Sequence, residues 1–426
     1  MTEQMNVPKL RFNGFEGDWI SHRINDVSEC VTSGSRDWAK YYSDKGDKFV
    51  RMTNLGREGI NLLLEDMRYV SIPTGGSEGQ RTSLQENDIL ISITAELGKI
   101  GIIPKDFGTA YINQHTALVR VNQQVNAKFL AQNLATKKSN KKINRLNDSG
   151  AKSGLNLSTI RNFEFTAPTS LPEQKKIASF LSKVDEKIAL LTEKKDKLTE
   201  YKKGVMQQLF NGKWEEQDGQ LTFIPPTLRF KADDGSEFPD WEEKALGDFS
   251  RIYDGTHQTP KYVDEGVPFY SVEHVTANQF EKTKYISEEV YAKECKRVTL
   301  KKGDILLTRI GSVGDVRLID WDVRASFYVS LALVKYNDEI VGQYLASFME
   351  SPNFQSELWK RMIHVAFPKK INLGEIGHCL VSVPSRDEQT KIANFLSAIA
   401  QKIDLANSEL ENAKEWKKGL LQQMFV

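Results

Sequence analysis

The chain has 426 residues, with 58 Lys and Arg against 57 Asp and Glu, so its formal charge is only +1. This balance excludes a polycationic protein of the histone type, but leaves DNA binding open because a neutral total can hide one basic face. A hydrophobic content of 39% supports two or three packed domains. The start lacks a signal-peptide pattern, no run of about 18 apolar residues occurs, and the three cysteines lie far apart. We therefore expect a protein of a reducing cytoplasm, without a membrane span, a disulfide framework or a CxxC metal site.

Most of the sequence consists of two similar copies, offset by about 215 residues. The clearest copies are 173–210 and 388–425, in which 18 of 38 positions are identical without a gap. At the other end of each copy, PKLRF at 8–12 is matched by PTLRF at 226–230. This period is too long for a solenoid unit. We infer a duplicated globular domain followed by a duplicated helix.

In chain order, each copy shows β-rich runs before helical stretches. DILISI (88–93) and TALVRV (116–121) read as buried strands, and 126–138 reads as a helix. The second copy repeats this order, with a helical stretch at 342–362. We expect each globular copy to be α/β or α+β with a twisted sheet. The expected divisions are an amino-terminal segment (1–27) that packs near the carboxyl terminus, a first domain (28–170), a first long helix (171–211), a linker (212–241), a second domain (242–385) and a second long helix (386–426).

The matched helices carry an apolar seam whose steps alternate between four and three over more than four heptads. A polar helix with one narrow apolar seam needs a partner. The other copy is the expected partner, paired antiparallel about a pseudo-twofold axis, which gives a circular arrangement. An intermolecular coiled coil in a homodimer is the alternative. The seam residues are Ile177, Leu181, Val184, Ile188, Leu191, Leu198, Ile392, Leu396, Ile399, Ile403 and Leu410.

Candidate base-reading residues lie in GSRDWAKY (34–41) and its counterpart GTHQTPKY (255–262), and on the strand expected next in each copy. Arginine can pair bidentately with guanine, whereas histidine at the matched position would read something else. Ordinary drift between duplicated domains and simple loop polarity are the alternatives. The candidates are Ser35, Arg36, Arg51, Asn54, Thr256, His257, Ser271 and His274.

Basic residues gather in what reads as a loop of the first copy, KKSNKKINR at 137–145, and before the matched NLxxI string of the second copy. Lysine beside Ser, Asn and Gly suits phosphate contacts, since charge and backbone N–H groups can both reach the oxygens. A merely solvated face is the alternative. The candidates are Lys137, Lys138, Lys141, Lys142, Arg145, Lys152, Lys360, Arg361, Lys369 and Lys370.

Catalytic motifs are missing from the sequence. The one Pro-Pro pair, in IPPT at 224–227, lacks the amide and the aromatic residue of an adenine-methyltransferase tetrapeptide. No GxxxxGK[ST] loop is present, so ATP binding is not expected. The six histidines show no ligand spacing, and no triad can be argued. The sequence indicates a binding protein without a catalytic or metal site.

The order of domain, long helix, domain and long helix resembles the specificity (S) subunit of Type I restriction-modification systems. The resemblance is carried by LPEQKKIASFLSKVDEKI (171–188), by the parallel P-x-x-x-EQ-x-KIA-x-FL run from Pro384, and by the GxxGD/GK strand turns. It covers nearly the whole chain. One departure is the absence of a short tandem repeat in the helical region, so no device for varying its length is evident.

The resemblance implies a division of labour. Each globular copy would be a target recognition domain that reads one half of a bipartite, asymmetric site in double-stranded DNA, and the paired helices would set the spacer. Two methyltransferase (M) subunits would dock on the helical region, and restriction (R) subunits would join them. S-adenosylmethionine, ATP and magnesium would bind these partners and not this chain, in a bacterial or archaeal cytoplasm. A coiled-coil scaffold that binds proteins without reading DNA is the rival interpretation.

Overall fold

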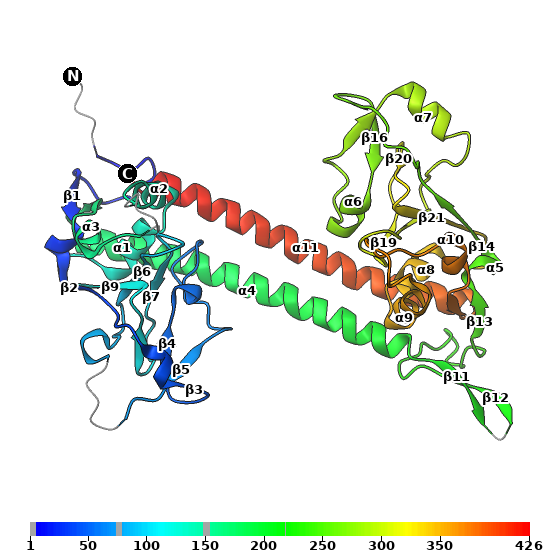
Figure 1. Ribbon diagram of the computed structural model, residues 1–426, viewed down its shortest axis with the longest axis horizontal. Coiled ribbons are helices and arrows are strands. Elements are labelled where there is room, and N and C mark those ends of the chain that lie inside the picture. The colour runs from blue at the N-terminus through cyan, green and yellow to red at the C-terminus, as the bar shows by residue number, and fades with distance from the viewer. Residues whose placement is uncertain (1–5, 74–78, 148–153, 218) are drawn as a thin grey trace. The chain divides into compact units, whose positions relative to one another are not determined.

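The computed structural model describes residues 6–73, 79–147, 154–217 and 219–426, and Figure 1 shows its elements. The chain divides into two compact units. Unit 1 comprises 1–192 and 408–426, and unit 2 comprises 193–407. Each unit therefore contains one globular copy and a stretch of both long helices.

Unit 1 contains a two-stranded antiparallel pair and two four-stranded sheets, with the orders β1-β10, β2-β9-β6-β7 and β3-β5-β4-β8. Three short helices lie between the last two strands, β9 and β10. The strands are β1 (Trp19–Arg23), β2 (Ser28–Ser33), β3 (Tyr42–Ser43), β4 (Asp47–Val50), β5 (Arg68–Val70), β6 (Ile89–Ser92), β7 (Ile100–Ile102), β8 (Ala110–Ile112), β9 (Thr116–Val121) and β10 (Glu164–Pro168). The short helices are α1 (Ala127–Leu134), α2 (Lys137–Arg145) and α3 (Leu157–Arg161).

Unit 2 repeats these sheets strand for strand, with the orders β13-β22, β14-β21-β18-β19 and β15-β17-β16-β20. Its strands are β13 (Glu242–Ala245), β14 (Ser250–Asp254), β15 (Tyr262–Val263), β16 (Val267–Tyr270), β17 (Lys284–Ile286), β18 (Ile305–Thr308), β19 (Val316–Leu318), β20 (Ser326–Phe327), β21 (Leu331–Tyr336) and β22 (Leu380–Val383). Its short helices are α5 (Leu246–Phe249), α6 (Val272–Ala277), α7 (Glu288–Glu294), α8 (Gly342–Met349), α9 (Pro352–Arg361) and α10 (Leu373–Gly377). A separate hairpin of β11 (Lys213–Gln217) and β12 (Gln220–Ile224) lies in the linker.

Two helical predictions need correction, because each predicted helix is broken by a capping residue. The stretch 126–138 divides at Thr136, whose hydroxyl accepts the N–H of Ser139 at 3.2 Å and starts α2. The stretch 342–362 divides at Ser351, which caps α9, with Pro352 in the first turn. The basic run 137–145 is consequently a helix and not a loop.

The long helices α4 (Leu171–Leu209) and α11 (Arg386–Met424) pair in opposite directions. In unit 1, the start of α4 packs with the end of α11, since Leu181 and Met424 belong to one core. In unit 2, the end of α4 packs with the start of α11, since Leu209 and Ile392 belong to one core. The start of each long helix thus meets the end of the other, which confirms the predicted intramolecular antiparallel pairing.

The amino-terminal segment lies against the end of α11 in unit 1. The N–H of Leu10 donates to the carbonyl of Gln423 at 2.9 Å, and the rings of Trp19 and Phe425 lie 6.3 Å apart. The two ends of the described chain are therefore neighbours, as the predicted circular arrangement requires.

The EQ and LRF strings, which occur in both copies, meet in the structure. Arg11 pairs with Glu173 at 2.7 Å, and Arg229 pairs with Glu388 at 3.0 Å, and both carboxylates are buried. The following glutamine, Gln174, accepts the N–H of Asn126 at 2.8 Å and donates to the carbonyl of Pro168. These contacts fix the start of each long helix to its globular domain, which explains why the two strings recur together.

The predicted seam residues are most buried where a globular domain covers the helices. Three in α4 and four in α11 are buried, namely Ile177, Leu181, Val184, Ile392, Leu396, Ile399 and Leu410. The other four are half-buried, namely Ile188, Leu191, Leu198 and Ile403. Lys202, a charged residue that lies four residues after Leu198 in α4, forms an ion pair with Glu350 at 3.1 Å.

Candidate nucleic-acid interface

A loop follows the first strand of the main sheet in each unit, and a glycine sets its position. Gly34 and Gly255 lie so close to the neighbouring strand that an added Cβ would stand 2.0 Å from the Ile112 carbonyl oxygen and 2.1 Å from that of Phe327. Only glycine permits this approach. The next residues, Ser35 and Thr256, form parallel bridges with the segments after β8 and β20. The two loops are therefore held in the same way.

The loops present different side chains at matched positions. Arg36 is exposed and makes no hydrogen bond or ion pair among the described residues. His257 is exposed too, but its Nε2 lies 2.7 Å from Asp254, which Arg297 also binds. Burial acts to raise the pKa of Asp254, but the hydrogen bonds from Arg297 and His257 outweigh it and lower that pKa. One loop thus offers a free guanidinium and the other a fixed imidazole, with Ser35 exposed and Thr256 buried.

The remaining base-reading candidates lie at short helices, not on strands as predicted. Arg51 and Asn54 lie at the two ends of a single 3-10 turn after β4, and Ser271 and His274 lie at the N-cap and in the first turn of α6 after β16. Asn54 accepts the N–H of Arg51 at 2.9 Å, and His274 Nδ1 accepts the N–H of Ser271 at the same distance. Asn54 and His274 are buried. Arg51 is occupied by Asp66. Asn54 and His274 thus each accept a backbone N–H three residues earlier in the chain, and this hydrogen bond closes an equivalent turn in each unit. Both side chains are used inside the protein and neither faces outward.

A second turn, formed by residues 92–98 and 308–314, adjoins these loops. Ser92 and Thr308 accept a backbone N–H of the returning strand, from Lys99 at 2.8 Å and Asp315 at 2.9 Å. Behind the turns, Asn140 of α2 donates to the Gly98 carbonyl and Gln355 of α9 donates to the Gly314 carbonyl. Helices α2 and α9 therefore support the same loop edge in their own units.

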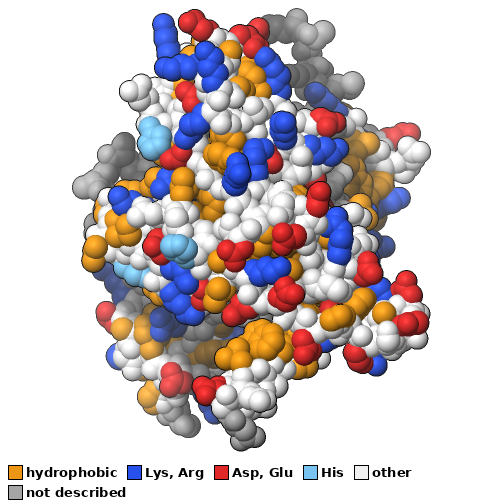
Figure 2. All heavy atoms as spheres, turned by 90° about the vertical axis from the view of Figure 1, so that its right-hand side faces the viewer, with side chains coloured by type: hydrophobic (Ala, Val, Ile, Leu, Met, Phe, Trp, Pro, Cys, Tyr) orange, Lys and Arg blue, Asp and Glu red, His pale blue; other side chains and the backbone are white. Residues whose placement is uncertain are grey.

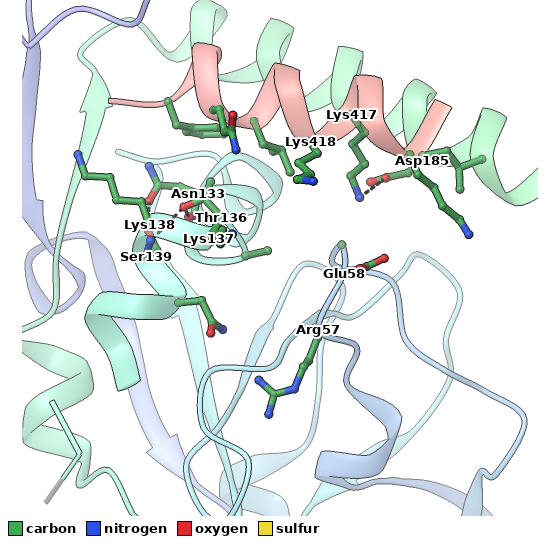
Figure 3. Close-up of a pocket in the computed structure, with 18 of the residues that line it drawn as sticks. Arg57, Glu58, Asn133, Thr136, Lys137, Lys138, Ser139, Asp185, Lys417 and Lys418 are labelled. Carbon is green, nitrogen blue, oxygen red and sulfur yellow. Dashed lines mark hydrogen bonds and ion pairs between the residues drawn. The ribbon is translucent and has the colours of Figure 1, made fainter. Parts of the chain in front are cut away.

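In unit 1, the lysines of α2 line a groove of about 970 Å³ that α4 and α11 also line. Figure 3 shows Lys137 and Lys138 on one side, Lys417 and Lys418 of α11 on another, and Arg57 with Glu58 on the third. Seven Lys and Arg side chains and four acidic ones line the groove. Lys417 is paired with Asp185 at 2.6 Å.

The three groove lysines of α2, Lys137, Lys138 and Lys141, are exposed and have no ion-pair partner in the described part of the chain. Lys142 points elsewhere, because its Nζ donates to the Glu164 carbonyl at 2.9 Å. Arg145 is exposed at the end of α2. The α2 side of the groove suits an anionic ligand, whereas the three α11 lysines that line it are each paired with a carboxylate. These α11 lysines were not predicted because they belong to the helical copy and not to the globular one.

The basic candidates of unit 2 are divided between α9 and the loop that follows it. Lys360 and Arg361 both bind Glu357, at 2.8 and 2.5 Å. Burial acts to raise the pKa of Glu357, but Lys360 and Arg361 outweigh it and lower that pKa. Lys369 and Lys370 are exposed in the loop. Lys152, the last predicted phosphate contact, lies outside the described residues.

Charges of both signs are mixed on the face shown in Figure 2, where Lys and Arg side chains alternate with Asp and Glu. This face therefore carries both signs of charge, as the near-neutral net charge of the chain does, and it is not uniformly basic. Among the described residues, no three His, Cys, Asp or Glu side chains gather to hold a metal ion. Within the same residues, no helix is both long and apolar enough to cross a membrane.

Comparison with known proteins gives consistent results. The family model for the Type I restriction modification DNA specificity domain matches residues 16–200 and 239–415. The MjaVIII specificity subunit of a type I restriction enzyme from Methanocaldococcus jannaschii is 26% identical over 266 residues, which span 60% of this chain and 60% of that relative.

Two solved structures share the fold across nearly the whole chain. The S subunit of a Type-I restriction-modification system from M. genitalium superposes with a TM-score of 0.65 at 16% identity, covering 99% of each chain. A chain from a study of complex assembly and conformational transition of the type I R-M system has a TM-score of 0.54 at 14% identity, covering 96% of this chain and 97% of its own. These likenesses establish the fold.

Proposed function

The chain belongs to the family of Type I restriction-modification specificity subunits, and from this premise we propose that its two units read the two halves of a bipartite site in double-stranded DNA. The main observation behind the proposal is that the two units share the same sheets but differ in the side chains of their equivalent loops. The sheets match strand for strand, whereas the equivalent loops carry Arg36 in one unit and His257 in the other. A common frame with different outward side chains suits an asymmetric site, because each base pair shows its own pattern in the major groove.

The unpaired lysines of α2 supply phosphate contacts in this proposal. Lys137, Lys138 and Lys141 lie on one helix that supports the loop edge through Asn140. Their charges hold the duplex without reading its sequence. Lys369 and Lys370 serve the same purpose in unit 2.

The paired helices provide the spacer and the docking sites. Each helix has 39 residues, which corresponds to about 58 Å. Lengthening both would move the half-sites along and around DNA together, since DNA turns once in about 10.5 bp. Each unit also exposes one leucine and one aromatic residue of these helices, at repeat-equivalent positions. They are Leu190 and Trp416 in unit 1, and Leu405 and Tyr201 in unit 2.

We assign these exposed apolar positions to two adenine methyltransferase subunits, one for each unit. The chain itself is non-catalytic in this proposal. S-adenosylmethionine binds the methyltransferases, and restriction subunits bring ATP, magnesium and cleavage to the assembly. The assembly works in the bacterial or archaeal cytoplasm, where the DNA lies.

The proposal is tested by mapping methylated adenines in cells. Co-expression with an adenine methyltransferase encoded beside this chain should produce one bipartite motif, with a methylated adenine in each half and a constant spacer between them. The purified chain alone should methylate nothing. Methylation without the partner would overturn the non-catalytic assignment. An assembled complex that binds all sequences alike would instead favour a scaffold without DNA readout.

A further inference from the structure

The loop after α9 in unit 2 has a fixed base. Ile363 donates its N–H to the Lys370 carbonyl at 2.8 Å, and Gly311 donates to the Lys369 carbonyl at 2.9 Å. Ile371 donates to the Arg309 carbonyl at 3.0 Å. Both ends of the segment 363–370 are therefore tied to each other and to the extension of β18. The loop is a closed projection and not a free strand of chain.

The tip of this loop is apolar and fully open to water. Val365 is 97% exposed and Phe367 is 103% exposed, the highest values among the large hydrophobic residues described. Beneath them, the rings of Trp359 and His364 lie 4.4 Å apart, and His364 Nε2 donates to the Trp359 carbonyl at 2.9 Å. A supported tip with two exposed apolar side chains is unfavourable in water unless a ligand covers it.

The surroundings of the tip are basic. Lys369 lies over the Trp359 ring, with its Nζ 5.0 Å from the ring centroid, and Lys370 is exposed beside it. The sequence from 362 to 374 contains no acidic residue. An apolar tip with cations on its flank and no acid in its own segment matches a polyanion with an apolar interior, which is the description of duplex DNA.

The loop shares its edge with the candidate base-reading loop of unit 2. Arg309 is buried, and its guanidinium donates to the Val329 carbonyl at 2.9 Å and to the Ile371 carbonyl at 3.2 Å. Val329 in turn donates its N–H to the Thr256 carbonyl at 3.0 Å. A continuous set of hydrogen bonds therefore joins the base of the 363–370 loop to the loop of Thr256 and His257.

We propose that Phe367 is an apolar wedge that enters between adjacent base pairs at the half-site read by unit 2, while Lys369 and Lys370 bind the flanking phosphates. The inference rests on the proposed function. Proteins that deform DNA insert Phe, Leu, Ile, Met or Pro between base steps, and they recover the cost of unstacking through added contacts. The wedge makes recognition by unit 2 depend on how easily one base step opens. In unit 1, the corresponding position falls in 148–153, outside the described residues.

The test uses the complex of the full chain with its methyltransferase partner on the mapped site. 2-Aminopurine, whose fluorescence rises when it unstacks, is placed in turn at each position of the unit 2 half-site. The wild type should raise the fluorescence at one step away from the methylated adenine. Phe367→Ala should abolish that rise and weaken binding roughly 5- to 150-fold, the range for losing one stacked aromatic contact. Phe367→Trp should retain both.

The salt dependence of DNA binding distinguishes the role of Phe367 from that of the neighbouring lysines. Phe367→Ala should leave the slope of log K against log salt unchanged, whereas Lys370→Gln should reduce that slope by about 0.9. Leu221→Ala, at a 69% exposed apolar position on β12, is the matched control and should change neither quantity.

Unchanged fluorescence and affinity in Phe367→Ala would overturn the proposal. Loss of the methyltransferase from the Phe367→Ala complex would overturn it too, because the tip would then be a protein contact. Failure of the proposed function would look different, since the wild-type complex would yield no mapped motif at all.

Discussion

At the residue scale, different side chains make the same structural contact at equivalent positions of the two units. An amide closes the turn after β4, through Asn54, and an imidazole closes the turn after β16, through His274. A buried guanidinium, that of Arg309, stands in unit 2 where Ile93 stands in unit 1, since both donate a backbone N–H across the same strand pair. Polar residues in a variable segment are therefore not all available to a ligand, because some of them hold the segment in shape.

Gly255→Ala tests the close approach that positions the loop of unit 2. The added Cβ would stand 2.1 Å from the Phe327 carbonyl oxygen, so the loop with Thr256 and His257 must move. We expect the unit 2 half-site to be lost from the methylation map, and the free energy of unfolding to fall by roughly 1–3 kcal/mol. Gly374→Ala, which meets nothing within 4 Å, should change neither. A Gly255→Ala variant with the wild-type motif and stability would contradict the argument.

The sequence predicted the exposure of Arg36 and His257 because the repeat aligned them in matched loops. It did not predict the burial of Asn54 and His274, since a cap depends on the angle between a strand and its following turn. The spacing of residues along the sequence does not determine that angle. Phe367 was missed for a related reason, because an apolar residue in sequence reads as a core residue until the fold shows that nothing covers it.

At the element scale, α2 shows where periodicity fails as a guide. Only Ile143 of its nine residues is buried, so the segment has no apolar stripe to indicate a helix. The Thr136 cap and the packing of Asn140 under the 92–98 turn hold it instead. By contrast, α4 and α11 were predicted well, because a seam repeated over many heptads is a strong signal.

The buried ion pairs that anchor the long helices offer a matched comparison between units. Arg11→Ala would leave the Glu173 carboxylate, 1% exposed, without a partner, and should lower the free energy of unfolding by about 3–5 kcal/mol. Arg229→Ala should cost roughly 1–2 kcal/mol less, because the Trp241 indole N–H still donates to Glu388 at 3.0 Å. Denaturant unfolding measures both changes.

The double variant Arg229→Ala/Trp241→Phe is the control, since it removes the remaining donor while keeping an aromatic ring. It should be destabilised at least as much as Arg11→Ala, because the smaller ring also leaves a cavity where the buried indole packed. If Arg11→Ala and Arg229→Ala had equal effects, the indole hydrogen bond would contribute nothing, and the explanation of the difference would be wrong.

At the scale of the whole molecule, the repeat determines more than either copy could alone. The offset of 215 residues predicted two equal folds, and the strand orders agree element by element. It also predicted that each long helix would find its partner in the same chain, because a seam and its copy are complementary when antiparallel. The identity of the bases read was out of reach, because pairing between side chains and bases depends on docking geometry.

Because the two units repeat the same exposed apolar positions, the proposal expects two methyltransferase subunits, one bound to each unit. Substitutions at these positions test that number. The pair Leu190→Asp/Trp416→Asp changes unit 1 alone, and Tyr201→Asp/Leu405→Asp changes unit 2 alone. Because a charge on an apolar contact must be buried unpaired, each pair should remove one methyltransferase, and all four changes should remove both. Native mass spectrometry of the co-expressed complex counts the subunits, and Leu221→Asp, at an exposed apolar position on β12, should keep both. Loss of both partners from a single pair would mean that the two docking sites are not independent, and no loss from any variant would place docking elsewhere on the chain.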